Sequence, residues 1–142
     1  MICTFKTIWG CLSLFPWLYQ YTAFGPLFLR LGLAAVFIVH GYPKVKNFGG
    51  TVRWLESLGF RPGIFWATVV VGTEFFGGLF LIVGFLVQPV ATLLVIDMLV
   101  AIWKVDYARG FKGGWELPFV LIVMALALLV LGPGAYSIDL PL

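Results

Sequence analysis

The chain has 142 residues, of which 62% are hydrophobic and 11% are charged, and its mean hydropathy is +1.07. This composition excludes a water-soluble domain and predicts a single membrane domain with several spans. The formal net charge is +3, but the basic residues stand at the ends of apolar runs. That placement favours a role in membrane topology over a nucleic-acid partner.

Residues 1–24 mix apolar side chains with Trp and Tyr and are interrupted by Pro16. Since Trp and Tyr favour the boundary between lipid and water, we expect an interfacial arm over this segment. A signal sequence is the alternative, although no clear cleavage site follows the apolar run. The two cysteines, Cys3 and Cys11, and the lone His40 are too few soft ligands for a metal site, so no bound metal is expected.

Residues 25–142 contain four apolar runs and predict an all-α fold, a transmembrane four-helix bundle. The first span is expected to end before Pro43, because proline disfavours the continuation of a helix. A tight reversal at Val87–Pro89 would make the second and third spans antiparallel neighbours. The expected spans are residues 25–43, 63–87, 90–106 and 115–132.

The loop between the first two spans, residues 44–62, carries four basic residues and a short amphipathic pattern from Thr51 to Leu58. This pattern predicts a short helix in the membrane interface, with Arg53 and Trp54 at the level of the headgroups. The alternative is a lid over a ligand site.

Basic residues also determine the expected topology. Seven of the nine lie in or beside the loops over residues 44–62 and 104–114, against Lys6 and Arg30 on the opposite side. Both loops are therefore predicted to be cytoplasmic and both termini to lie outside.

Glu74 is the only charged residue in the apolar run from Gly63 to Leu86. A carboxylate in the middle of a span is costly where it faces lipid, so it should point into the bundle. Gly77 and Gly78 flank Glu74 on the helix surface and permit close helix packing there. Glu74 is thus expected on a packed face.

The polar residues within and at the ends of the spans are the candidate site. We expect Arg30 to meet Glu74, with Asp97 nearby, and Lys44 and Lys104 to meet Glu116. Two interpretations remain open for each group, an ion pair that determines helix packing and a binding or proton-transfer role. The candidates are Arg30, His40, Lys44, Glu74, Asp97, Lys104 and Glu116.

Several segments together resemble the DoxX family of small four-span membrane proteins. They are RLGLAAVFIVHGYPK in the first span, GTEFFGGLFLIVG in the second, a Glu at the start of the fourth, and the closing GPGAYSID. The similarity extends from about Leu27 to Asp139. It implies that Arg30, Lys44 and Glu74 are family residues, together with the terminal motif Gly132, Pro133, Gly134 and Asp139.

The resemblance also implies a four-helix bundle associated with membrane redox chemistry, since some members accompany thiosulfate:quinone oxidoreductases. Our first hypothesis is therefore a subunit of a membrane redox system linked to a quinone or a sulfur compound, with no tightly bound cofactor. The first alternative is a non-catalytic scaffold or accessory subunit, and a weaker one is a carrier of protons or small solutes. Expected partners are the lipid bilayer and other membrane proteins or further copies of this chain.

Overall fold

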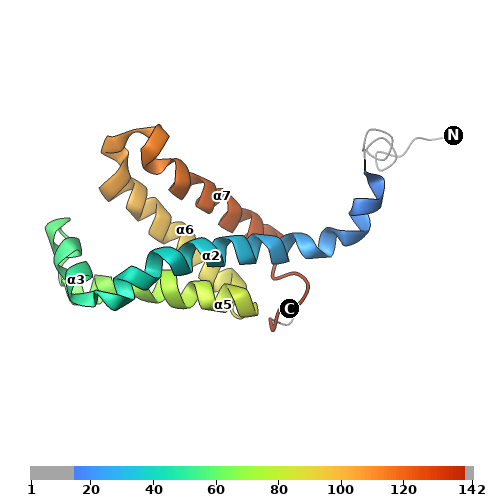
Figure 1. Cartoon of the computed structure of the whole chain (residues 1–142), viewed down its shortest axis with the longest axis horizontal. Coiled ribbons are helices and arrows are strands. Elements are labelled where there is room, and N and C mark those ends of the chain that lie inside the picture. The colour runs from blue at the N-terminus through green and yellow to red at the C-terminus, as the bar shows by residue number, and fades with distance from the viewer. Residues whose placement is uncertain (1–14, 140–142) are drawn as a thin grey trace.

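The computed structural model describes residues 15–139, and these are almost entirely helical with no strands. They form four long helical rods joined by short connections, whose course can be followed in Figure 1. A 3₁₀ segment, η1 (Pro16–Phe24), leads into the first rod. The rods are α2 (Gly25–Lys46), α4–η2–α5 (Gly63–Val71, Gly72–Phe76, Gly77–Val83), α6–η3 (Val87–Ala101, Ile102–Asp106) and α7 (Glu116–Leu131). The connections contain α3 (Phe48–Ser57), η4 (Tyr107–Arg109) and η5 (Phe111–Trp115). The all-α four-helix bundle expected from the sequence is confirmed.

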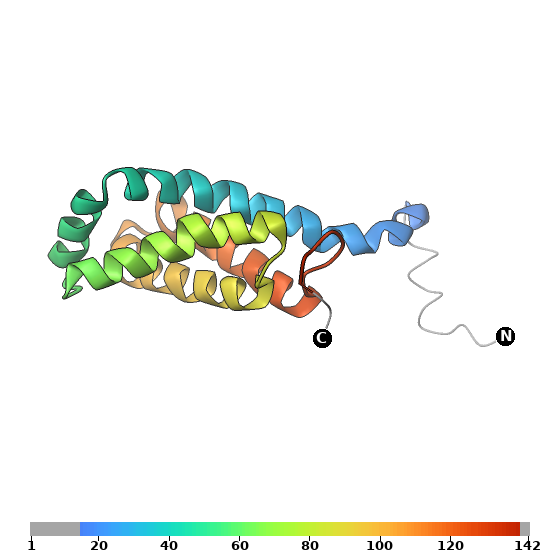
Figure 2. The same cartoon turned by 90° about the horizontal axis from the view of Figure 1, so that it is seen from below.

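Within residues 15–139, three helices are long and apolar enough to cross a membrane. They cover Gln20–Lys46, Gly63–Val83 and Phe111–Leu131. The rod formed by α6 and η3 completes the bundle, and Figure 2 shows all four running side by side. Many large apolar side chains point outward, for example Val130 at 88% exposure, as expected where lipid replaces water.

The first helix does not end before Pro43, as the sequence suggested, but continues through it to Lys46. Proline removes one backbone hydrogen bond from a helix, yet here the helix closes again with the Asn47 amide donating to the Pro43 carbonyl at 2.9 Å. Lys44 and Lys46 then lie in the last turn, where positive charge is favourable. Lys44 is therefore held on a rigid helix rather than in a loop.

The reversal between the second and third rods lies earlier than predicted. The second rod ends at Val83, and Gly84 and Leu86 adopt left-handed backbone conformations that turn the chain. The next helix begins at Val87. Pro89 therefore lies in its first turn, where proline is tolerated because the backbone amide there has no partner within the helix.

Two glycines bring α2 into close contact with the second rod. A β-carbon on Gly41 would come within 2.8 Å of the Phe75 backbone nitrogen, and one on Gly78 within 2.8 Å of the Ile38 side chain. Gly77 faces Val90 of α6 instead. The second rod is thus packed closely on both sides of Glu74 by small residues, as in many membrane helix interfaces.

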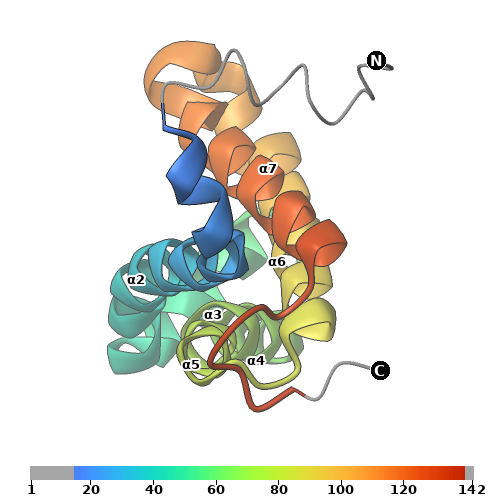
Figure 3. The ribbon, with the colours of Figure 1, turned by 90° about the vertical axis from the view of Figure 1, so that its right-hand side faces the viewer.

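The last described segment, residues 132–139, crosses one end of the bundle over α5 and α6, as the end-on view in Figure 3 shows. The amides of Ile138 and Asp139 both donate to the Gly84 carbonyl. The Asp139 carboxylate accepts from the Leu86 amide at 2.7 Å and from the Val87 amide at 2.6 Å. Asp139 therefore caps α6 from the far end of the chain.

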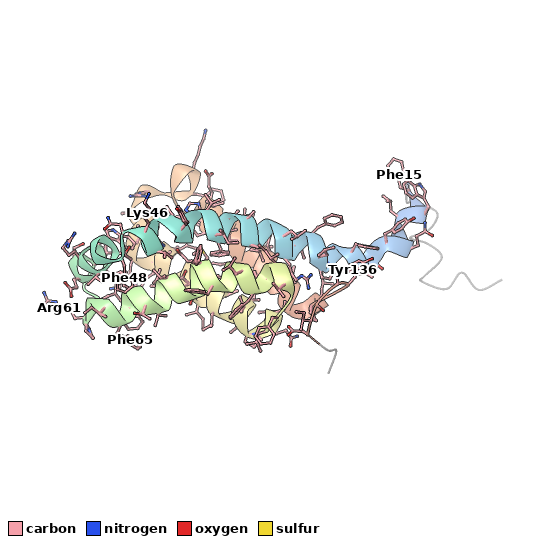
Figure 4. All side chains as sticks on the ribbon, turned by 60° about the horizontal axis from the view of Figure 1, so that its bottom comes forward. Phe15, Lys46, Phe48, Arg61, Phe65 and Tyr136 are labelled. Carbon is pink, nitrogen blue, oxygen red and sulfur yellow. The ribbon has the colours of Figure 1, made fainter. Side chains whose placement is uncertain are left out.

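The two ends of the bundle differ in composition. Figure 4 places Tyr136 near the start of α2 and Phe15 just before the projecting η1 segment, whereas Lys46, Phe48, Arg61 and Phe65 lie at the opposite end. Of the expected arm over residues 1–24, only residues 15–24 are described; Cys3, Lys6 and Cys11 lie outside the described residues. This part leaves the bundle with Trp17 and Tyr21 exposed.

Candidate functional site

Glu74 lies at the centre of η2, a single π-helical stretch within the second rod. A π-turn adds a residue to the helical repeat and changes the direction of the side chains around it, and such turns are frequent at functional sites. Glu74 is 4% exposed, as expected from the cost of placing its charge in lipid. Lys104 lies in a second π-helical stretch, η3.

The cation that meets Glu74 is Lys44. Its Nζ donates to Glu74 Oε1 at 2.5 Å and joins the end of α2 to the middle of the second rod. The Glu74 side chain is 5% exposed and that of Lys44 is 26% exposed, so the pair is shielded from water on one side only. The second carboxylate oxygen, Glu74 Oε2, is buried and has no hydrogen-bond partner.

An apolar cavity of about 120 Å³ lies beside this ion pair, between the second rod, α3 and α6. Its polar side is formed by Lys44, Thr73, Glu74, Asp97 and Lys104. Asp97 lines this cavity together with Glu74 and Lys44, and its Oδ2 is buried without a partner. The remaining lining is almost wholly apolar, so the few polar groups converge on a small, mostly dry space.

Aromatic side chains from the connection after α2 cover the apolar cavity. Trp54 of α3, Phe60 of the following loop and Trp66 of α4 all line it, and the rings of Phe60 and Trp66 lie 5.4 Å apart. Asn47 caps α3 by accepting from the Gly50 amide at 3.1 Å. The short interfacial helix thus contributes to the wall of the cavity, and Trp54 has a place in it that the sequence analysis did not assign.

The apolar cavity is open toward lipid. Val69, Leu93 and Ile96 line it and are themselves 40%, 50% and 52% exposed on the outer surface of the bundle. A lipid-facing groove, lined by Gly72, Gly77, Phe80 and Val90, continues from this opening and shares Val69, Thr73 and Leu93 with the cavity. A lipid-soluble molecule could therefore enter sideways between α4 and α6.

A second cavity of about 330 Å³ lies on the other side of the ion pair. Most of its lining is apolar, but it is more polar than the first cavity, and we call it the polar cavity. It shares Lys44, Glu74 and Trp54 with the apolar cavity and is also lined by residues of α2, α6 and α7. Its charged or titratable members beyond the pair are His40, Asp106 and Arg109. The Lys44–Glu74 pair thus borders both an apolar and a polar space.

The expected pairing of Arg30 with Glu74 is wrong. Arg30 is fully buried, but Nη1 donates to the Pro133 carbonyl at 2.9 Å and Nη2 to the Tyr136 carbonyl at 3.1 Å. Arg30 lies near the first turn of α2, so its forked donor group meets the chain segment that crosses that end of the bundle. Together with the Asp139 cap, Arg30 holds the terminal Gly132-Pro133-Gly134 motif in place.

The expected contact of Lys44 and Lys104 with Glu116 is also wrong. Glu116 is exposed, and its carboxylate accepts from the Gly113 amide at 3.1 Å in the turn before α7. Its charge lies in the first turn of α7, where negative charge is favourable. Lys104 Nζ lies 4.2 Å from the centroid of the Trp103 ring. The three groups do not meet because Lys44 is already paired deeper in the bundle.

The structure thus brings four of the candidates together around the apolar cavity: Lys44, Glu74, Asp97 and Lys104. His40 is exposed and lines only the polar cavity. Of the aromatic residues near Glu74, Phe75 packs against α2 and Phe76 is exposed. No group of three or more His, Cys, Asp and Glu residues able to hold a metal occurs in the described part of the chain.

Comparison with protein families matches residues 25–106 to the DoxX family model. This match includes Arg30 and all four residues around the apolar cavity. The chain belongs to the DoxX family.

Other DoxX-like relatives cover most of the chain. Inner membrane proteins YqjF and YphA of Escherichia coli (strain K12) are 33% and 31% identical, over 81% and 80% of this chain and 89% and 86% of their own lengths. A Bacillus subtilis (strain 168) protein named "Putative oxidoreductase CatD" is 28% identical over 81% of this chain and 84% of its own length. No solved structure gave a significant match. The relatives support a membrane location for this DoxX protein.

Proposed function

We propose that this DoxX protein is the quinone-binding subunit of a membrane redox system. The proposal is supported mainly by the apolar cavity. The Lys44–Glu74 pair and Asp97 line it together with aromatic side chains, and it opens toward lipid. The redox association is also supported by the name of the Bacillus subtilis relative, "Putative oxidoreductase CatD".

The size of the cavity suits a single ring. A dry cavity of about 150 Å³ accommodates benzene. The apolar cavity, at about 120 Å³, is somewhat smaller, and its opening toward lipid provides the additional space that a substituted ring needs. Trp54 and Trp66 offer flat surfaces for stacking. A quinone oxygen is a hydrogen-bond acceptor, and the ammonium group of Lys44 is a matching donor beside the cavity.

The lipid-facing groove suits the tail of the same ligand. It begins where the cavity opens and runs along the outside of the second rod, where a β-carbon on Gly72 would meet no atom of a neighbouring element within 4 Å. Glycine at this position leaves room for an apolar chain. The ligand class that fits both spaces is thus a small ring with an isoprenoid tail.

Reduction of a quinone to a quinol takes up two electrons and two protons and forms two O–H bonds. In this proposal the DoxX chain supplies the binding site and the protons, and an electron-transfer protein bound to it supplies the electrons. A quinol releases the same electrons and protons in the reverse direction.

The test measures quinone binding to the full chain in lipid nanodiscs by saturable quenching of Trp fluorescence. We expect saturable binding of a long-chain ubiquinone, and Glu74→Gln and Lys44→Met should each weaken it about tenfold, because a hydrogen bond to a charged group contributes about 1.5–3 kcal/mol. Trp103→Phe is the matched control, since Trp103 is 70% exposed and outside both cavities. Quenching that rises without saturation, or is equal in all variants, would refute the proposal.

The groove is tested separately with Gly72→Leu. This change should weaken binding of the long-chain ubiquinone but leave a single-isoprene analogue unaffected, because only the tail would lie in the groove. Leu126→Phe, on the exposed surface of α7, serves as the control. Equal weakening for both quinones would place the ring, not the tail, against Gly72 and contradict the proposed orientation.

An accessory role is the second candidate, favoured by the η1 segment. Residues 15–24 project beyond the bundle and expose Phe15, Trp17 and Tyr21. Deletion of residues 1–23 should then release partner proteins that co-purify with the full chain, while quinone binding remains. Unchanged co-purification would count against this role.

A further inference from the structure

We infer that Glu74 and Asp97 together hold one exchangeable proton, and that this proton reaches water through the polar cavity rather than through the opening toward lipid. This inference rests on the proposed function in one respect: the proton would be transferred to a bound quinone. The geometry that supports it does not depend on any ligand.

Charge in the buried cluster gives the first argument. Lys44 is the cation in contact with Glu74, and Asp97 lines the same apolar cavity as both. With both carboxylates ionised, Lys44, Glu74 and Asp97 would carry one net negative charge at the wall of an apolar cavity. Lys104 also lines this cavity, but its ammonium group lies over the exposed Trp103 ring, and among the described residues it forms no ion pair with either carboxylate. Two negative charges close together in a poorly solvated site are unfavourable, so the cluster should take up one proton. That proton makes the cluster neutral.

The unpartnered oxygens give the second argument. Glu74 uses Oε1 for Lys44, whereas Glu74 Oε2 and Asp97 Oδ2 are both buried without a hydrogen-bond partner. Two buried acceptors without a donor are unfavourable, and a proton on either carboxyl group converts one acceptor into a donor. A proton shared by the two carboxyl groups therefore satisfies both oxygens at once.

The two cavities supply the route. Glu74 and Lys44 border the polar cavity, whereas Asp97 lines only the apolar one. The other groups that titrate or carry charge around the two spaces are His40, Lys104, Asp106 and Arg109. Asp106 and Arg109 form an ion pair of 3.2 Å in which Arg109 is 65% exposed, so this end of the polar cavity is in contact with water. A proton can pass from there to Glu74 and on to Asp97.

The charge balance of the proposed step is simple. The O–H bond of the protonated carboxyl breaks, the proton moves to an oxygen of the quinone as that ring accepts electrons from the partner protein, and the carboxylate is left ionised. A proton from bulk water, taken up through the polar cavity, then restores the protonated pair. The step occurs twice for each quinone reduced, once for each electron and each new O–H bond. Quinol oxidation uses the same groups in reverse.

The first experiment counts the proton by infrared spectroscopy of the full chain in nanodiscs at neutral pH, without quinone. The wild type should show the C=O band of one buried protonated carboxyl group. Glu74→Gln and Asp97→Asn should each remove this band, because the remaining carboxyl group pairs with Lys44 and ionises. Lys44→Met should raise the band about twofold, since without the cation both carboxyl groups hold protons.

Glu116→Gln is the control, because Glu116 is exposed and distant from the cluster, and the band should not change. Persistence of the band in Glu74→Gln would show that Asp97 is protonated by itself and would overturn the shared proton. Absence of the band in the wild type would overturn it as well. Because no quinone is present, these results are independent of whether quinone binds.

The second experiment tests the route by following the shift of the same band after transfer to D₂O. Leu117→Trp fills the polar cavity and should slow the shift several-fold, whereas Leu58→Trp fills only the apolar cavity and should not. The opposite pattern would overturn the polar route. If the band behaves as expected but ubiquinone does not bind, the proton pair stands and the proposed function fails.

Discussion

Gly41 of α2 lies directly against the backbone of Phe75, the residue that follows Glu74 in η2. Lys44 comes one turn after Gly41 on the same helix, so this contact determines how far the Lys44 ammonium group must reach. The absence of a side chain at one position therefore sets the separation of the buried ion pair.

Gly41→Ala should separate α2 from the second rod and weaken the ion pair. Its β-carbon would overlap with Phe75 backbone atoms, and overpacking of this kind costs about 1–3 kcal/mol. We expect a lower midpoint of thermal unfolding in detergent micelles. Gly72→Ala is the matched control, because Gly72 has free space and alanine favours helices by up to about 1 kcal/mol. A Gly41→Ala protein as stable as the control would show that the contact is not restrictive.

Lys44→Met and Glu74→Gln should each destabilise the protein more than the double variant does. Removal of one partner from a buried ion pair costs about 3–5 kcal/mol. The expected loss here lies below that range, because Lys44 is partly exposed and because the inferred response of Asp97 and the shared proton compensates part of the lost charge. The double variant leaves no unpaired charge on these two residues. Thermal unfolding of the three variants tests this ranking, with Arg109→Met at the exposed ion pair expected to cost about 1 kcal/mol or less. Additive losses would argue against coupling of the two residues.

Arg30→Lys should loosen the C-terminal segment without affecting quinone binding. Lysine lacks the fork that donates to the Pro133 and Tyr136 carbonyls together, so one partly buried carbonyl loses its donor, at a cost toward the lower end of about 1–3 kcal/mol. Hydrogen exchange at residues 132–139 should increase. Arg53→Lys, in the exposed part of α3, is the control. A loss of quinone binding in a folded Arg30→Lys protein would contradict this prediction and indicate that Arg30 contributes to the ligand site.

Asp139→Ala should destabilise the start of α6. The carboxylate accepts from two backbone amides at this helix end, and loss of a helix cap costs about 0.5–2 kcal/mol. Faster hydrogen exchange at Leu86 and Val87 is the expected observation, and Asp139→Asn should show a smaller effect because its amide retains one acceptor oxygen. Protection equal to the wild type in Asp139→Ala would show that water replaces the cap at no cost.

The orientation in the membrane follows from the basic loops and remains a prediction. Residues 44–62 and 104–114 should face the cytoplasm and residue 135 the outside. After replacement of Cys3 and Cys11 by Ser, a single Cys at Ala135 should react with an impermeant thiol reagent in intact cells. A Cys at Ser57 should react only after the membrane is opened, and the reverse pattern would invert the topology.

The sequence alone was sufficient for the class of fold. Long apolar runs interrupted by Gly, Pro and basic residues predict membrane helices because lipid provides no hydrogen bonds to the backbone. The burial of Glu74 and the small residues beside it were predictable for the same reason, since charge avoids lipid and glycine permits close packing. The helix boundaries at Pro43 and Val87 were less accurate, because the hydrogen bonds that continue or begin a helix there come from the surrounding structure.

The partners of the buried charges could not be predicted. The expected depth of each residue along its span suggested Arg30 as the partner of Glu74. Depth, however, does not specify which face of one helix packs against which face of another. Arg30 instead donates to a segment about a hundred residues away in the sequence. That segment is not helical, so the periodicity of the sequence does not predict its path over the end of the bundle. Trp54 was missed as a cavity residue for a similar reason, because an aromatic residue in an interfacial helix has the same sequence pattern whether it lies against lipid or over a cavity.

The hydrophobicity of the chain thus determined that this protein spans a membrane as helices and that its intramembrane charges are turned inward. This is because the free energy of transferring a residue from water to lipid depends mainly on the residue itself. Only the tertiary structure decided that Lys44, Glu74 and Asp97 share one cavity wall. That outcome depends on the rotation and closeness of neighbouring helices, which in turn depend on contacts such as Gly41 with Phe75 between residues far apart in the sequence.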